Sequence, residues 1–103
     1  MCTYVTESTA ASGSGKGPAG WFPLSTTTVY YDHPVHAQAE HTLNIDFANP
    51  TRGAGERVAV ELTTRAAVDL LASVASVLAQ VPSDLSGVDP ASARRVLDAV
   101  RDL

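Results

Sequence analysis

Residues 29–50 read Val-Tyr-Tyr-Asp-His-Pro-Val-His-Ala-Gln-Ala-Glu-His-Thr-Leu-Asn-Ile-Asp-Phe-Ala-Asn-Pro, and this stretch decides the fold that we predict. Residues 26–33 are mostly threonine, valine and tyrosine, which favours a β-strand that ends at Pro34. Residues 41–48 alternate apolar and polar side chains, the pattern of a half-buried strand. The stretch therefore predicts an antiparallel β-hairpin with a polar loop.

The segments on either side of this hairpin differ in composition. Residues 57–62 alternate again after turn-forming residues at 49–55, and they predict a third strand. Residues 1–7 are rich in β-formers and could form a short strand or an ordered arm. The stretch at 8–20 is rich in Ser, Ala and Gly, and this composition predicts a loop or linker. Its Ser-Gly-Lys-Gly run lacks the other positions of a phosphate-binding loop, so we do not expect a nucleotide site there.

The carboxyl-terminal part of the chain predicts two helices. The first begins at Thr63 or Thr64 and runs to about Gln80, and Asp89-Pro90 begins a second that ends at Asp102. The second helix is predicted to bury Ala93, Leu97 and Val100, with Val96 beside them. The first helix carries two apolar stripes: Val68, Leu71, Ala75 and Leu78, and then Leu70, Val74, Val77 and Val81. One apolar face is enough to cover a sheet, so the surplus predicts a contact with the last helix or with a second copy of the chain.

These segments together predict an α+β fold. We expect an antiparallel sheet of three or four strands, with two helices packed on one face, in a single domain over residues 1–103. The composition agrees, because 103 residues with 45% hydrophobic and 17% charged side chains suit one modest core. The double-striped helix predicts a homodimer.

Charge and composition exclude several functional classes. The net charge of −4 argues against nucleic-acid binding, which normally requires a basic face. The longest apolar region is shorter than the roughly 20 residues of a membrane span, so we expect no membrane partner. The single cysteine cannot form an intramolecular disulfide, and the start of the chain lacks the order of a secretory signal. A cytoplasmic protein is the resulting expectation.

Three motifs carry a resemblance to other proteins. They are the opening Met-Cys-Thr-Tyr-Val-Thr-Glu, the segment Gly-Lys-Gly-Pro-Ala-Gly-Trp-Phe, and Asp-His-Pro-Val-His followed by Glu-His-Thr-Leu-Asn-Ile-Asp-Phe. In these motifs the chain resembles an uncharacterised family of small bacterial proteins, over roughly its first half to two-thirds. The resemblance implies no activity, so the functional prediction rests on the residues themselves.

The histidines indicate a metal site. His33, His36 and His41 are all the histidines of the chain, and a hairpin would bring the first and last of them together at its end. Neutral imidazole is the commonest protein ligand for late transition metals, and Cys2 could supply a thiolate as the fourth ligand. We predict a divalent transition metal, with zinc the first choice and copper, nickel or iron as alternatives.

Carboxylates near the histidines suggest catalysis. Asp32, Glu40 and Asp46 could each act as a ligand, as an acceptor that orients an imidazole, or as a general base, and we predict Glu40 and Asp46 as catalytic. A metal-bound water with a lowered pKa would suit hydrolase or lyase chemistry on a small molecule. The sequence does not name a substrate.

Other functions stay open. In the first, the histidines are incidental, and the protein is a non-catalytic accessory or interaction subunit that docks through Trp21-Phe22 and an apolar helix face. In the second, the histidines serve catalysis or ligand binding without a metal. In the third, Cys2 is the nucleophile of a thiol enzyme, activated by a nearby histidine.

Overall fold

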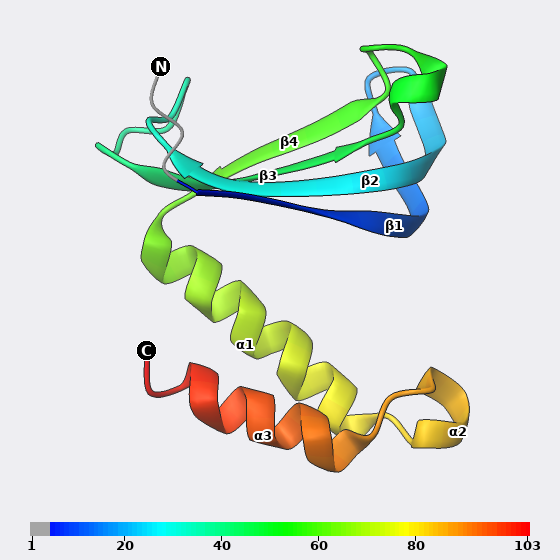
Figure 1. Ribbon diagram of the computed structural model, residues 1–103, viewed down its shortest axis with the longest axis vertical. Helices are drawn as coiled ribbons and strands as arrows, with labels where there is room; N and C mark the ends of the chain where they lie inside the picture. The colour runs from blue at the N-terminus through cyan, green and yellow to red at the C-terminus, as the bar shows by residue number, and fades with distance from the viewer. Residues whose placement is uncertain (1–4) are drawn as a thin grey trace. The chain divides into compact units, whose positions relative to one another are not determined.

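The computed structural model describes residues 5–103, which divide into two compact units at residues 5–63 and 64–103. The first unit is a four-stranded antiparallel sheet in the order β1-β2-β3-β4 (Figure 1). Its elements are β1 (Val5–Gly17), β2 (Gly20–Asp32), β3 (Thr42–Ala48), the 3-10 turn η1 (Pro50–Arg52) and β4 (Arg57–Leu62). The α+β class and the antiparallel sheet are confirmed.

The second unit is helical. It contains α1 (Thr64–Gln80), the short α2 (Ser83–Ser86) and α3 (Pro90–Val100), and α1 packs against α3. Asp89 begins α3 as predicted, because its side chain accepts the backbone N–H of Ala91 at 3.1 Å. The two helices of the sequence prediction are confirmed. The single domain over residues 1–103 and the packing of both helices on one sheet face stay predictions.

The predicted loop at residues 8–20 is wrong, because most of this stretch belongs to β1. Its small polar side chains pair across to β2, where Ser8 Oγ lies 3.3 Å from Thr28 Oγ1. The register shifts between Ala10 and Gly13, which marks a β-bulge on β1. A β-carbon at Gly15 would lie 3.1 Å from Leu24 Cδ2, so this glycine allows a close approach that a larger residue would obstruct.

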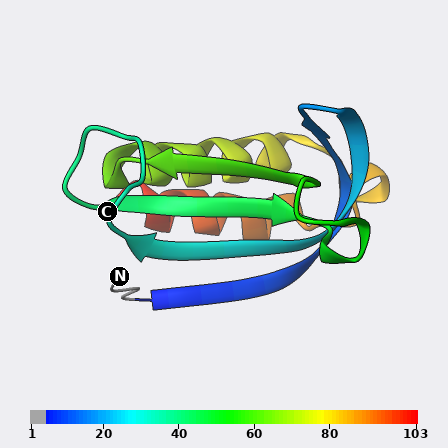
Figure 2. The ribbon, with the colours of Figure 1, turned by 90° about the horizontal axis from the view of Figure 1, so that it is seen from above.

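The sheet is coiled. The end of β1 approaches the start of β4, and a β-carbon on Gly17 would lie 3.8 Å from the carbonyl oxygen of Arg57 (Figure 2). Phe22, which is 3% exposed, fills the space under this end of the hairpin. Its neighbour Trp21 is 71% exposed. The predicted Trp21-Phe22 pair is thus divided between the interior and the surface.

Strand pairing sorts the side chains of the sheet onto two faces. Tyr31, Leu43 and Leu62 are paired in register on one face, and Tyr30, Asn44 and Glu61 are paired on the other. The second face holds the most buried polar groups of the unit, since Asp32 and Thr42 are both 0% exposed. The loop at residues 33–41 connects these two residues, so the most buried part of the sheet unit at this end is polar.

The core of the helical unit follows the sequence prediction for α3. Ala93, Leu97 and Val100 are buried, whereas Val96 is half exposed. On α1, Ala75 is buried, while members of both predicted stripes are exposed: Leu70, Leu71, Val74 and Val77. Among residues 5–103 no helix has both the length and the apolarity to cross a membrane.

The burial of Leu97 predicts that Leu97→Ala destabilises the protein much more than Val96→Ala at the adjacent position. Leu97→Ala should lower the free energy of unfolding by about 2–5 kcal/mol, because it leaves a cavity in a side-chain position that is 1% exposed. Val96→Ala, the matched control, should cost less than about 1 kcal/mol because Val96 is 49% exposed. Urea denaturation followed by far-ultraviolet circular dichroism measures both. Equal losses would contradict this core.

Candidate functional site

The end of the β2–β3 hairpin brings two histidines together. Asp32 and Thr42 are the last paired residues of the two strands, and His33 and His41 are the next residue on each side. Their ring centroids lie 4.7 Å apart, with an angle of 32° between the ring planes. The sequence prediction that a hairpin would bring these two imidazoles together is confirmed.

This histidine pair continues into an aromatic stack. The ring of Tyr31 lies 5.9 Å from that of His41, with an interplanar angle of 19°. His33 Nδ1 lies 3.1 Å from the carbonyl oxygen of Glu40, a hydrogen-bond distance for the tautomer that carries its proton on Nδ1. The backbone N–H of His33 is donated to Asp32 Oδ1 at 2.7 Å. The His33 ring therefore contacts both the His41 ring and the carbonyl oxygen of Glu40.

A single carboxylate holds the loop that follows. Glu61, on β4, accepts the backbone N–H groups of Val35, His36 and Ala37, the last two at 2.9 and 2.8 Å. Three successive N–H groups directed at one anion form a backbone nest. These hydrogen bonds, that from Val35 first and that from Ala37 second, lower the pKa of Glu61 below its ordinary value of 4.5, and the charge of His36 adds to the effect.

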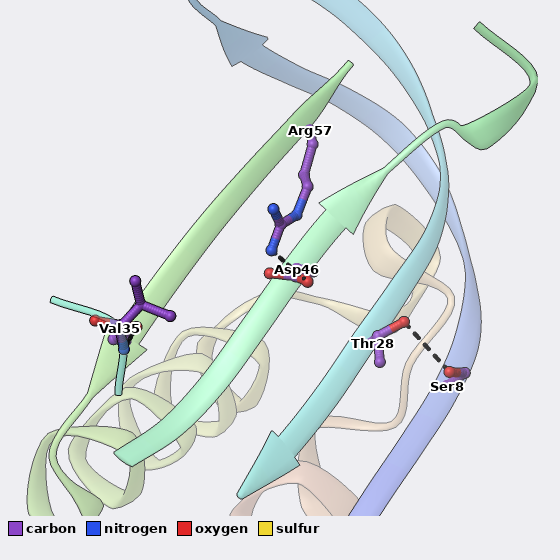
Figure 3. Close-up of polar contacts among 6 residues, drawn as sticks. Ser8, Thr28, Val35, Asp46 and Arg57 are labelled. Atoms are coloured by element: carbon purple, nitrogen blue, oxygen red, sulfur yellow. Dashed lines mark hydrogen bonds and ion pairs between the residues drawn. The ribbon is translucent and has the colours of Figure 1, made fainter. Parts of the chain in front are cut away.

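An open pocket lies between this loop and the start of β4. Its volume is about 510 Å³. Within it, Arg57 Nη2 contacts Asp46 Oδ2 at 2.8 Å, and Figure 3 shows Arg57 reaching across to Asp46. The lining residues are Tyr30, Val35, His36, Ala37, Asp46, Arg57, Ala59, Val60 and Glu61. Figure 3 also shows Val35 at the other end of β4 from Arg57.

The predicted metal ligands separate into three groups. His33 and His41 form the pair, His36 lies in the wall of the pocket, and Cys2 lies outside the described residues. Within residues 5–103, no group of three or more His, Cys, Asp or Glu side chains is arranged to hold a metal ion. The structure thus joins two of the three predicted histidine ligands and leaves His36 apart.

The predicted catalytic carboxylates are also separated. Glu40 is exposed, and its carbonyl oxygen is the atom beside the His33 ring. Asp46 lies five residues beyond His41, about 16 Å along an extended strand, and it lines the pocket. Asp46 is therefore not a neighbour of the histidine pair.

Sequence reasoning missed Arg57 and Glu61. Strand alternation carried a signal for them, because residues 57, 59 and 61 share the face opposite to Val58 and Val60. That signal becomes specific only with the register, which pairs Ala59 with Asp46 and Glu61 with Asn44.

The anchoring role of Glu61 predicts a loop that loosens in acid. Because its pKa is lowered by the loop N–H groups, the anchor is complete above the ordinary value of 4.5 and is lost as the pH falls through the lower folded-state value. Glu61→Gln should release the loop at neutral pH, since an amide has one acceptor oxygen for three N–H donors. Amide hydrogen exchange at Val35, His36 and Ala37 measures the release.

The control for this experiment is Glu56→Gln. Glu56 makes a 4.0 Å ion pair with Arg52 and does not bind the loop, so the variant should leave these three amides protected. If both variants change the exchange of the loop amides equally, the assignment of Glu61 as the anchor is wrong.

One comparison with known proteins gives a match, and the matched residues include all four strands. No curated protein and no solved structure matches this chain. A protein-family model matches residues 1–87, which contain the sheet, α1 and α2, whereas α3 begins beyond the match. This match confirms the resemblance to an uncharacterised family and extends it past the motifs that indicated it. The chain belongs to the family of unknown function DUF6295.

Proposed function

We propose that this protein binds a divalent transition metal, with zinc the first choice, at the end of the β2–β3 hairpin. The observation that carries the proposal is the separation of 4.7 Å between the ring centroids of His33 and His41. Two imidazoles bound to one tetrahedral zinc ion, with Zn–N distances of about 2.0–2.1 Å, have ring centroids about 5 Å apart. Coordination would require one nitrogen of each ring to point at the same ion.

The contact of His33 with Glu40 supports the same proposal. A metal-binding histidine usually donates its other ring N–H to a carboxylate or a backbone carbonyl, which selects the tautomer and the ring orientation. His33 Nδ1 stands 3.1 Å from such a carbonyl oxygen. In that tautomer Nε2 carries the lone pair that a metal would use.

Cys2 is the proposed third ligand. It precedes Val5 by three residues, and Val5 pairs with Tyr31, two residues before His33. Three residues of chain span at most about 11 Å, so connectivity allows a Cys2 thiolate to reach this end of the sheet. A Cys-His-His set with a water in the fourth position would lower the pKa of that water, which suits hydrolase or lyase chemistry with Glu40 as the base.

The proposal predicts which variants lose metal affinity. Titration of the untagged protein with Co²⁺ should produce the visible bands of a tetrahedral site, together with a thiolate charge-transfer band that disappears in Cys2→Ser. His33→Ala and His41→Ala should each weaken Zn²⁺ binding by at least about tenfold, measured by competition with a chelating dye.

His36→Ala is the matched control, because His36 belongs to the pocket wall and not to the histidine pair. It should leave the Zn²⁺ affinity unchanged. Zn²⁺ binding that survives both His33→Ala and His41→Ala would exclude this site.

A second candidate function is a non-catalytic interaction module that self-associates through its helical unit. It is favoured by the exposure of large apolar residues on α1, where Val74 is 50% and Val77 is 59% exposed. Units of about 40 residues seldom bury enough apolar surface alone, so a second copy of the chain is the proposed cover for this surface.

This candidate predicts a dimer that a charge on α1 disrupts. Sedimentation velocity should show a concentration-dependent dimer for the natural sequence and a monomer for Val77→Lys, because a lysine would be desolvated in an apolar interface. Gln80→Lys, on the same helix at a polar position, should remain dimeric. A monomer at every concentration of the natural protein would refute self-association.

A further inference from the structure

The two apolar stripes of α1 lie one residue apart in the sequence. The first stripe packs toward α3 through the buried Ala75. Each member of the second stripe comes one residue earlier, so that Leu70, Val74 and Val77 precede Leu71, Ala75 and Leu78. One residue turns an α-helix by about 100°, so the second stripe faces nearly at a right angle to α3.

The helix α3 repeats this arrangement. Its buried residues face α1, and they are Ala93, Leu97 and Val100. The residues one position earlier form a second stripe of small or apolar side chains, and they are Ser92, Val96 and Ala99. The second stripe of α3 is therefore also turned by about 100° from the contact between the helices.

The antiparallel packing of the two helices brings both second stripes to the same side of the helix pair. Figure 1 shows α3 returning alongside α1, and Arg65 Nη1 at the start of α1 donates to the carbonyl oxygen of Leu103 at 3.2 Å. In an antiparallel pair, equal one-residue offsets turn toward the same side. The residues that follow the buried ones on α3 turn to the other side, and they are charged: Arg94, Asp98 and Arg101. The helix pair thus has one apolar face and one polar face.

The apolar face contains a groove between α1 and α3, with a volume of about 240 Å³. Val74 lines it from α1, and Ser92 and Val96 line it from α3, with Val88 adding to the wall. Val74 is 50% and Val96 is 49% exposed. The Ser92 hydroxyl already donates to Asp89 Oδ2 at 2.9 Å, so an apolar occupant does not leave it unpaired. The groove therefore suits apolar side chains.

The spacing of the second stripe favours helices as the occupant. Residues 67, 70, 74 and 77 follow the steps of three and four residues that mark a coiled-coil seam, and all of them are Ala, Leu or Val. In a four-helix bundle each helix contacts two neighbours that lie nearly at a right angle around it. The two stripes of α1 and of α3 have that angle.

A second copy of the helix pair supplies a matching surface. The apolar face carries no charge at positions 70, 74, 77, 92, 96 and 99, so two copies can meet without burying a charge. The 17 residues of α1 are about 25 Å long, and two adjacent helices are about 20 Å wide, which gives a footprint of about 500 Å² per copy. A total of about 1,000 Å² reaches the lower limit for a specific interface.

We propose that two copies of this chain form a four-helix bundle, in which the apolar face of one helix pair covers that of the other. The proposal rests on the self-association proposed above and specifies its geometry. α1 packs antiparallel against α1 of the second copy with Val74 at the two-fold axis, and α3 packs against α3 of the second copy through Val96. β4 ends at Leu62 and α1 begins at Thr64, so this arrangement places the attachment points of the two sheet units at opposite ends of the bundle.

Sedimentation velocity of the full-length chain tests whether α3 belongs to the interface. Val96→Lys should raise the dimer dissociation constant at least about tenfold, because the lysine would lose its water against the second copy. The control Asp98→Asn changes the net charge by the same amount on the polar face of α3, and it should leave the constant unchanged. A dimer that tolerates Val96→Lys refutes the bundle and leaves self-association through α1 alone.

Disulfide formation tests the position of the two-fold axis. In a Cys2→Ser background with a chelator present, Val74→Cys should form an intermolecular disulfide on oxidation with diamide, because helices packed at this position bring the two Cα atoms within the roughly 4.4–6.8 Å that a disulfide spans. Ser76→Cys faces the other side of α1 and should remain reduced. A dimer in which Val74→Cys links no faster than Ser76→Cys refutes this geometry. A natural protein that is monomeric at every concentration refutes the bundle and self-association together.

Discussion

The register of the β2–β3 pairing is the constraint on which both candidate sites depend. It ends with Asp32 opposite Thr42, and this places His33 and His41 side by side just beyond the last pair. A slip of one residue would move every side chain of a strand to the other face. The histidine stack would then separate, and Asp46 would leave the face that carries Arg57. One set of backbone hydrogen bonds thus positions two chemically different surfaces.

The loop between these strands depends on polar interactions rather than on an apolar core. Beneath it, Thr42 Oγ1 donates to Asn44 Oδ1 at 2.7 Å, and both residues are buried. The Glu61 carboxylate supplies acceptors for three of the loop's N–H groups. Buried polar groups stabilise a structure only when their hydrogen bonds are satisfied, so this loop has a specific conformation despite its polar sequence. The same conformation builds one wall of the pocket.

The two compact units have different kinds of surface. The sheet unit combines charged and aromatic groups in places where a metal or a small molecule could bind, whereas the helical unit has an apolar interior around Leu97 and exposed apolar residues on α1. The family match includes the whole sheet and α1 but ends before α3. The proposed metal site on the hairpin therefore lies in the part of the chain that the family shares, whereas the proposed helix bundle also includes α3.

The sequence by itself determined most of the local structure. Alternation located β3 and β4, proline and threonine marked the ends of α1, and the spacing of Ala93, Leu97 and Val100 indicated the buried face of α3. It also predicted that His33 and His41 would meet, because the two residues that flank the loop of a hairpin directly follow its last strand pair. These features follow from residue periodicity and from contacts close along the chain.

Only the tertiary structure decided the rest. It made the glycine- and serine-rich stretch a strand, because this stretch pairs with β2 and Gly15 allows the close approach of Leu24. It also separated His36 from the other histidines, because Glu61 binds its backbone N–H from 25 residues away. The ion pair of Asp46 with Arg57 joins two strands in the same way. Such contacts depend on which strands pair and in what register, and local composition carries no information about that.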